Sequence, residues 1–197
     1  MDSAILVVTR VADLSSLASD DIAISADDNG TFSTTTAVYL FHRSQAAWKQ
    51  VVRIQNPIAD YTGFGEAVSL RADTLVVGAA EGLNSGSAWL IERDASGAWG
   101  TPLLLSPLRG ESIPGGHVGE AIATDAMTIV IGMPGVGMTR ISSRSDQGWE
   151  TPRWFKPPRT GAYSHLGSAV AVDGERIVVA DHYDGLRARN AGAVYVH

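Results

Sequence analysis

One pattern recurs four times along the sequence, at intervals of roughly 50 residues: two short aliphatic runs joined by a polar turn. The copies begin at Val11, Phe64, Val118 and Leu166. A repeat of this length is typical of solenoids and propellers, in which one structural unit stacks on the next and buries a shared core. The repeat therefore constrains the fold more strongly than any single residue does, although it says little about a ligand.

Two further apolar runs follow in each of the first three units, and a tryptophan marks the turn between them. This residue is Trp48, Trp99 or Trp149. Short runs rich in β-branched and aromatic residues, separated by Gly, Asp, Ser and Asn, predict an antiparallel meander of four strands. Four such strands make the blade of a β-propeller. We expect the recurring Trp side chains to pack between neighbouring sheets.

The two ends of the sequence predict how a ring closes. The last unit stops after its third strand, at His197, while the apolar run at residues 4–8 precedes the first unit. Pairing of residues 4–8 with residues 193–196 would complete the last blade and remove two exposed sheet edges.

We therefore expect an all-β fold, a β-propeller of four four-stranded antiparallel blades, closed by pairing of the N-terminal strand in the last blade. Residues 1–197 form a single domain, with repeats at about 11–63, 64–117, 118–165, and 166–197 plus 1–10. The alternative is an arc of a larger ring of roughly six to eight blades.

Composition argues against several classes of function. The chain has no cysteine, which excludes disulfides, thiolate metal sites and cysteine nucleophiles. A net charge of −6 argues against a surface for nucleic acid or anionic membranes. No apolar run is long enough for a membrane-spanning helix, and no secretory signal peptide is visible. We expect no nucleic-acid partner and no membrane insertion.

The sequence contains no motif that assigns a cofactor, a metal or a catalytic residue. Residues 132–137 superficially resemble a glycine-rich dinucleotide loop, but a strand is expected to follow where that motif needs a helix. The Gly-x-Ser-x-Gly and His-Glu-x-x-His patterns are both missing. We therefore expect no cofactor.

Phe64-Gly65, followed by Gly78-Ala79, resembles the FG-GAP repeat, which is named for its Phe-Gly and Gly-Ala-Pro signatures. The third unit carries Gly132-Met133-Pro134, the fourth carries Leu166-Gly167, and the first unit departs most from the pattern. The resemblance implies a propeller like those of integrin α-subunits and bacterial surface proteins. It also implies an interaction module, with cell adhesion and an extracellular or cell-surface location as expectations.

Many members of this family bind calcium through an aspartate-rich loop between the first and second strands. Calcium needs six to eight oxygen ligands, hence several carboxylates at alternating positions. The corresponding turns here contain at most two carboxylates each. We expect tight turns without calcium loops.

The candidate binding face is one rim of the propeller. Because strands alternate in direction, loops after second strands and links between blades emerge on the same side, and these are the long connections. Binding residues concentrate in variable loops on a rigid scaffold. The candidates are Asp27, Asp28, Phe32, Tyr61, His117, His165, Asp181, His182, Tyr183 and Asp184.

The sequence leaves three functional hypotheses open, of which the most modest is a structural or assembly protein in which two such rings, or two open half-rings, associate. The other two rest on these residues. The first is a non-enzymatic binding module, monomeric or homodimeric, that presents this face to a protein or carbohydrate partner of neutral or positive charge. The alternative is a hydrolase or lyase with His117, His165, His182 and Asp181 at the mouth of the channel. Imidazole and carboxylate groups serve as general bases or zinc ligands, but they are also common as turn-capping loop residues.

Overall fold

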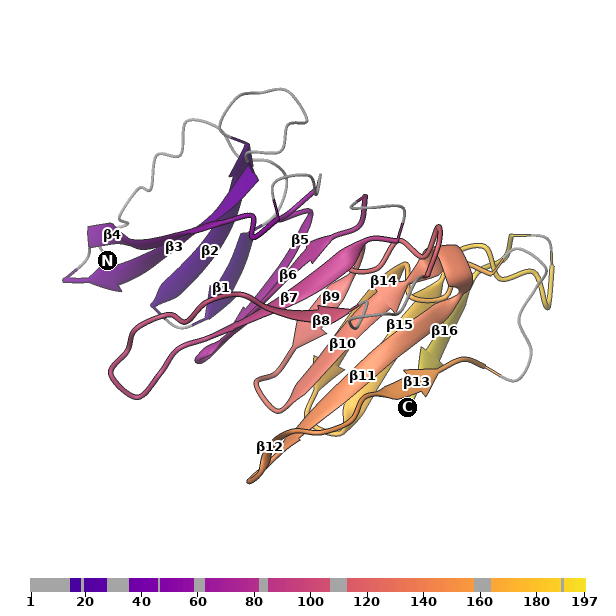
Figure 1. Cartoon of the computed structure of the whole chain (residues 1–197). Coiled ribbons are helices and arrows are strands. Elements are labelled where there is room, and N and C mark those ends of the chain that lie inside the picture. The colour runs from indigo at the N-terminus through magenta and orange to yellow at the C-terminus, as the bar shows by residue number, and fades with distance from the viewer. Residues whose placement is uncertain are drawn as a thin grey trace.

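The computed structural model describes residues 15–18, 20–27, 36–45, 47–58, 63–81, 85–106, 113–157, 164–188 and 190–197. These residues form four antiparallel sheets, which lie side by side in a row (Figure 1). Within this part of the chain, no helix is long and apolar enough to cross a membrane.

Each sheet is built from consecutive strands, as the repeat predicts. The first contains β1 (Ser15–Ala18), β2 (Asp21–Asp27), β3 (Thr36–Ser44) and β4 (Ala47–Gln55). The second contains β5 (Ala67–Arg71), β6 (Thr74–Ala79), β7 (Ser87–Glu92) and β8 (Leu103–Ser106). The third contains β9 (Ile122–Thr124), β10 (Thr128–Met133) and β11 (Met138–Ser145), with β12 (Gly148–Trp149) and β13 (Arg153–Phe155) both paired to β11. The fourth contains β14 (Ala169–Asp173), β15 (Arg176–Asp181) and β16 (Ala193–Val196).

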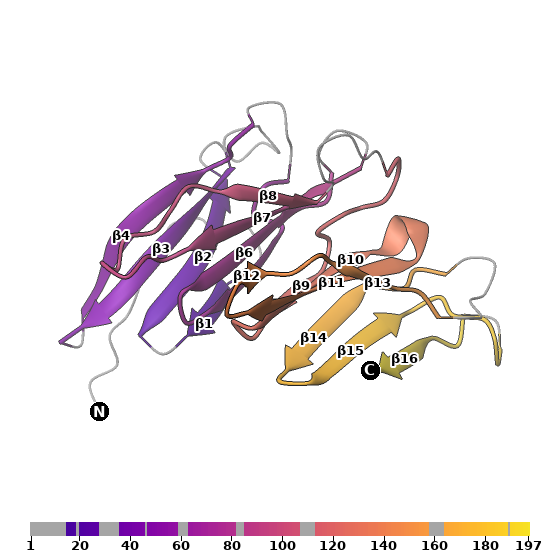
Figure 2. The same ribbon diagram turned by 60° about the horizontal axis from the view of Figure 1, so that its bottom comes forward.

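The first strands of the sheets face one another along the row. Strand β5 contacts both β1 and β9, and β9 also contacts β14. Figure 2 shows the sheets following one another from the first, with β1 to β4, to the last, with β14 to β16. Sheets that meet through their first strands and carry later strands outward have the arrangement of propeller blades. The predicted all-β fold of antiparallel, propeller-type sheets is confirmed.

Between each pair of sheets lies an apolar core. One face of the first sheet, with Val38 and Leu40, packs on Leu75 and Trp89 of the second. A buried apolar core of the same kind lies between the second and third sheets and between the third and fourth. Trp99 and Trp149 pack, half-buried, against the first and second of these cores, which confirms the predicted position of these tryptophans between sheets.

The glycine signatures have a steric reason. Gly119 and Gly167, each at the start of a unit, have φ values of 87° and 94°, which favour glycine. Each lies over a strand glycine of the preceding sheet. A Cβ on Gly78 would lie 2.0 Å from the Gly119 carbonyl oxygen, and a Cβ on Gly132 would lie 2.0 Å from that of Gly167. The signature therefore lets consecutive sheets approach closely.

The turns between first and second strands are tight, as predicted. Only Ala72 and Asp73 join β5 to β6, and only Gly174 and Glu175 join β14 to β15. The glycine-rich segment after β10 forms a single 3₁₀ turn, η2 (Pro134–Val136), before β11 begins. A turn of this length provides no helix N-terminus for a pyrophosphate.

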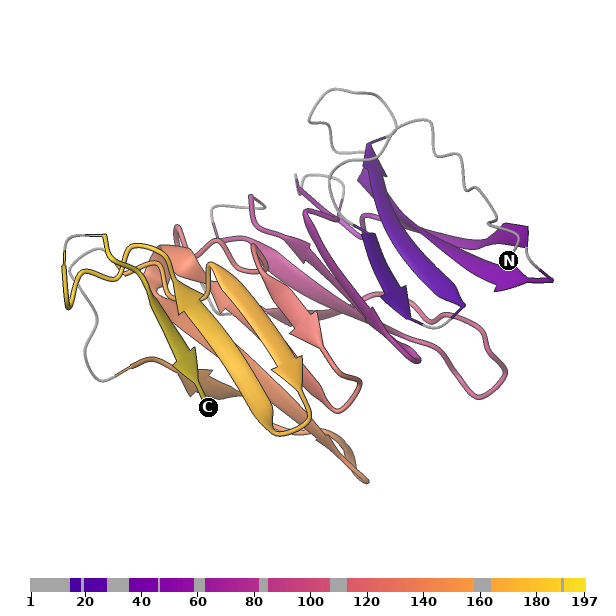
Figure 3. The ribbon, with the colours of Figure 1, turned by 180° about the vertical axis from the view of Figure 1, so that it is seen from behind.

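The first and last sheets lie at opposite ends of the row (Figures 1 and 3). Among the described residues, the last sheet has three strands and β16 pairs only with β15. Residues 4–8, predicted to close the ring there, lie outside the described residues. The closed four-bladed ring therefore stays a prediction.

Candidate functional site

Loops after second strands and links between sheets meet on one side of the row, as predicted from strand direction. The Val118 N–H donates to the Ser85 carbonyl at 2.9 Å, and the Gly135 N–H donates to the Gly116 carbonyl at 3.2 Å. Further along, Ser164 Oγ donates to Asp181 Oδ2 at 2.6 Å. We call this side the loop rim; its described residues are 63–66, 79–81, 85–87, 113–121, 134–137, 164–168, 181–188 and 190–192.

Three rings gather on the loop rim of the last sheet. The ring centroids of His165 and His182 are 5.3 Å apart, and Tyr183 lies 4.8 Å from His165 and 4.1 Å from His182. His182 and Tyr183 are exposed, Tyr183 by 42%, while His165 is half-buried. We call these three residues the aromatic cluster. It offers aromatic surface and imidazole nitrogens to solvent.

The buried side chain of Asp181 fixes the backbone that carries the aromatic cluster. Its carboxylate is fully buried and accepts three hydrogen bonds, from Ser164 Oγ at 2.6 Å and from the backbone N–H groups of His165 and Tyr183 at 3.0 Å. One side chain therefore ties the link before β14 to the loop after β15. Through these three hydrogen bonds, Asp181 organises the loop that carries the aromatic cluster.

Asp184 anchors the far end of the same loop. It is buried, and its carboxylate accepts hydrogen bonds from the Leu186 N–H at 2.8 Å and from the Tyr195 hydroxyl at 2.9 Å. Burial, together with this hydrogen bond to a carboxylate, raises the pKa of Tyr195 to about 12. The loop that carries Tyr183 is thus fastened both to Asp181 and to β16.

The structure brings two of the three candidate histidines, His165 and His182, together. His117 is exposed and lies outside the aromatic cluster, with its Nδ1 3.6 Å from Glu120 Oε2. Its backbone has a positive φ of 50°. In the described ranges, no group of three or more His, Asp or Glu side chains is arranged to hold a metal ion. Asp27 ends β2. Asp28, Phe32 and Tyr61 lie outside the described residues.

Sequence reasoning missed the arginines that accompany the tryptophans on the opposite side of the row. The Arg43, Arg93 and Arg144 guanidinium groups lie over the rings of Trp48, Trp99 and Trp149, at 5.7, 4.6 and 5.5 Å from the ring centroids. The recurrence of an arginine shortly before each tryptophan was a usable signal. We call this side, with its turns between third and fourth strands, the hairpin rim.

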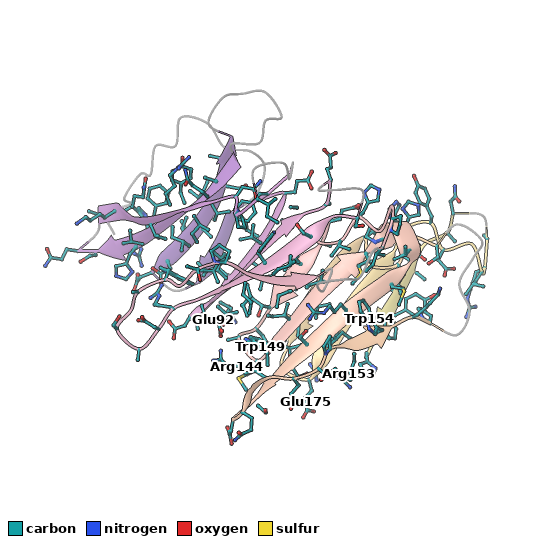
Figure 4. The ribbon with its side chains drawn as sticks, viewed as in Figure 1. Glu92, Arg144, Trp149, Arg153, Trp154 and Glu175 are labelled. Carbon is teal, nitrogen blue, oxygen red and sulfur yellow. The ribbon has the colours of Figure 1, made fainter. Side chains whose placement is uncertain are left out.

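Two of these arginines also bind the preceding sheet. Arg93 Nη2 donates to Asp21 Oδ2 at 2.6 Å, and Arg144 Nη1 donates to Glu92 Oε1 at 2.7 Å. Trp149 Nε1 donates to the same Glu92 oxygen at 3.3 Å. Figure 4 shows Glu92, Arg144 and Trp149 grouped between the second and third sheets. The hairpin rim therefore links sheets.

Comparisons with known proteins agree with the repeat and the fold. The family model of the FG-GAP repeat matches residues 157–197. The solved structure of Kuenenia stuttgartiensis hydrazine synthase resembles the chain with a TM-score of 0.55 at 14% sequence identity. The similarity covers 93% of this chain and 58% of that chain, so this chain spans little more than half of it. A search of curated proteins gives no match. The resemblance to the FG-GAP repeat is thus confirmed: residues 157–197 carry the repeat, and the sheets have a β-propeller fold.

Proposed function

We propose that the chain is a non-enzymatic interaction module that presents its loop rim to a protein or carbohydrate partner. The observation that carries the proposal is the aromatic cluster, exposed at the surface yet held by the buried Asp181. Rings with an apolar face and a polar edge suit both sugar stacking and protein contact. A preorganised loop also loses less conformational entropy on binding.

Charge on the same rim favours a neutral or cationic partner. Burial is the main cause of a raised pKa at Glu66, and the neighbouring carboxylates of Glu81 and Glu120 raise it further. The Ala80 N–H donates to Glu66 Oε2 at 2.8 Å, which fixes this carboxylate on the rim. Acidic groups close enough to influence one another attract positive charge and repel negative charge. The sequence candidates Asp27, Asp28, Phe32 and Tyr61 belong to the same proposed face.

A glycan array and a peptide array probed with the labelled chain test this function. We expect bound features that disappear with Tyr183→Ala and with His182→Ala. The matched control is Leu103→Ala, since Leu103 is an exposed apolar residue, by 59%, on β8 away from the loop rim. Signals that survive both rim substitutions, or a blank array for the native chain, would reject the proposal.

We further propose that the four sheets are blades of a ring and that residues 4–8 supply the fourth strand beside β16. In the other sheets the third strand carries such a neighbour, namely β4, β8 or β13. A fourth strand on β16 would cover an edge that otherwise presents unpaired backbone groups.

A further inference from the structure

The same β-turn leads into the second, third and fourth sheets, and a backbone hydrogen bond from its last residue to its first closes it. The donor and acceptor residues are Glu66 and Gly63 at 2.9 Å, Glu120 and His117 at 3.2 Å, and Ser168 and His165 at 3.1 Å. His117 and His165 therefore hold equivalent positions on the loop rim of consecutive sheets. Because packed sheets lie about 10 Å apart, about that distance separates the two histidines.

The two equivalent histidines have different neighbours. Beside His165, the loop after β15 supplies His182 and Tyr183, whose ring centroids lie 5.3 and 4.8 Å from the His165 ring. Beside His117, the loop after β10 supplies the turn η2, and a Cβ on Gly135 would lie 2.9 Å from His117 Cδ2. The His165 position thus carries a cluster of rings, while the His117 position carries one ring against bare backbone.

His117 and Glu120 form an exposed polar pair. Nδ1 of His117 lies 3.6 Å from Oε2 of Glu120, and the two side chains are 53% and 43% exposed. A neutral imidazole has one N–H donor and one nitrogen acceptor, and a carboxylate has only acceptors. A hydroxyl group, which both donates and accepts, can therefore satisfy both of its hydrogen-bonding functions here. We call these two residues the polar subsite.

The turn η2 connects the polar subsite to the aromatic cluster. At one end, its Gly135 contacts His117. At the other end, Gly137 packs on Ser164, whose Oγ lies 3.0 Å from the position that a Cβ on Gly137 would take. Ser164 in turn donates to Asp181, which fixes the loop of the aromatic cluster. A continuous surface therefore runs from the polar subsite across η2 to the aromatic cluster.

The middle of this surface has little aliphatic character. Within residues 134–137, Pro134 is buried, Val136 is half-buried, and Gly135 and Gly137 have no side chain. Protein partners bind chiefly through apolar, aromatic or arginine anchors in well-packed pockets. A sugar needs only an aromatic face on which its ring can stack and polar groups for its hydroxyls. The surface therefore suits a chain of sugars better than a protein.

Charge restricts the kind of sugar. The carboxylates of Glu66, Glu81 and Glu120 lie close enough on the loop rim to influence one another. Negative charges that are close together repel an anionic ligand. Sugars with carboxylate, sulfate or phosphate groups are therefore disfavoured, and neutral sugars are favoured.

We propose that the loop rim binds a neutral linear oligosaccharide, which spans two subsites. One sugar stacks on the aromatic cluster, the chain crosses η2, and a second sugar forms hydrogen bonds with His117 and Glu120. This inference rests on the proposed interaction module and adds the class of its partner and a second contact site. Over about 10 Å, one sugar ring does not fill both subsites. Affinity therefore rises with chain length, because the second contact becomes intramolecular.

The dependence of affinity on chain length gives the first test. The probes are glucose, N-acetylglucosamine, mannose and xylose, each compared with its linear oligomers by titration calorimetry. We expect one series to bind, with a lower Kd for the oligomer than for the single sugar. Equal Kd values within every series that binds would overturn the inference. If peptides bind on the array and no saccharide does, the sugar class is wrong while the interaction module stands; if neither binds, both proposals fail.

Substitutions at the polar subsite give the second test. His117→Gly removes the ring without backbone strain, since Gly63 holds the same turn position with φ 80°. We expect this variant and Glu120→Ala each to weaken oligomer binding about tenfold, as for one lost hydrogen bond, and to leave single-sugar binding unchanged. The control is Glu175→Ala, in the exposed turn between β14 and β15 at the opposite end of the sheets (Figure 4). Oligomer binding that survives both polar-subsite substitutions but is lost with Tyr183→Ala would overturn the second subsite and leave the interaction module intact.

Discussion

The two rims of the sheets use carboxylates in opposite ways. On the hairpin rim, Asp21 and Glu92 accept hydrogen bonds from arginines of the next sheet, so the charges bridge sheets. On the loop rim, Asp181 is buried and accepts backbone N–H groups, so it shapes a loop whose rings face solvent. The difference indicates that the hairpin rim holds neighbouring sheets together, while the loop rim exposes side chains that are available to a partner.

The largest expected effect lies beneath the loop rim, where the sheets touch. Gly132→Ala would place a Cβ 2.0 Å from the Gly167 carbonyl oxygen, and the backbone has no room to yield. We expect a loss of about 3 kcal/mol or more in the free energy of unfolding. Urea denaturation measures it. In the control Gly185→Ala, the nearest atom to the new Cβ is 3.9 Å away, and a loss of the same size there would contradict the explanation.

Removal of the Asp181 carboxylate should affect stability and binding together. Asp181→Ala leaves three donors without their acceptor, two of them backbone N–H groups beside the aromatic cluster. We expect a loss of about 2–3 kcal/mol in unfolding free energy and the loss of array signals. Calorimetry and the array report the two quantities. A stable variant with unchanged signals would show that Asp181 does not organise the rim.

On the hairpin rim, Arg144→Ala should have a smaller effect and leave binding intact. The Arg144–Glu92 pair is about one-third exposed, so solvent screening limits its contribution. Together with the contact to Trp149, we expect a loss of about 1 kcal/mol. A double-mutant cycle with Glu92→Gln isolates the ionic part, which should shrink in high salt. A coupling that grows with salt would contradict an ionic bridge.

The smallest effect concerns Tyr195, which fastens the Tyr183 loop to β16. Its pKa is raised from 10 to about 12, chiefly by burial and then by the bond to Asp184, so the folded state favours the neutral phenol. This stabilisation is fully present below pH 10 and is lost as the pH rises from 10 to about 12. Tyr195→Phe should flatten the dependence of melting temperature on pH in that window. If the pH dependence of melting temperature is the same in Tyr195→Phe as in the native chain, Tyr195 is not the group whose raised pKa causes it.

The sequence predicted the parts of this account that depend on repetition. Strand order, the tight turn at Ala72 and Asp73, and the packing of Trp99 and Trp149 follow from periodicity and turn chemistry, which are local. Strand direction also brought His165, His182 and Tyr183 to one rim. The sequence did not separate His117 from them, because His117 lies before β9 in the third sheet, beside Glu120, while the aromatic cluster lies on the fourth sheet.

The contacts between sheets were harder to foresee. The bond between Arg93 and Asp21 joins residues far apart in sequence, and only the stacking of two sheets brings them together. The glycine signatures match a family pattern in the sequence. The steric reason for them, a carbonyl oxygen that lies against a Cα without a Cβ, is visible only in the folded structure. The sequence predicts Asp181 as a loop residue on the binding face. Its burial depends on the folded loop and cannot be predicted from the sequence pattern.

The most direct test of the division between rims is a paired comparison of Tyr183→Ala and Arg144→Ala. For each variant, array binding and the free energy of unfolding are measured beside the native chain. We predict that Tyr183→Ala weakens binding by more than about 1 kcal/mol and leaves stability unchanged, while Arg144→Ala lowers stability and leaves binding unchanged. Unfolding of Tyr183→Ala, or loss of binding in Arg144→Ala with retention in Tyr183→Ala, would contradict the assignment of the two rims.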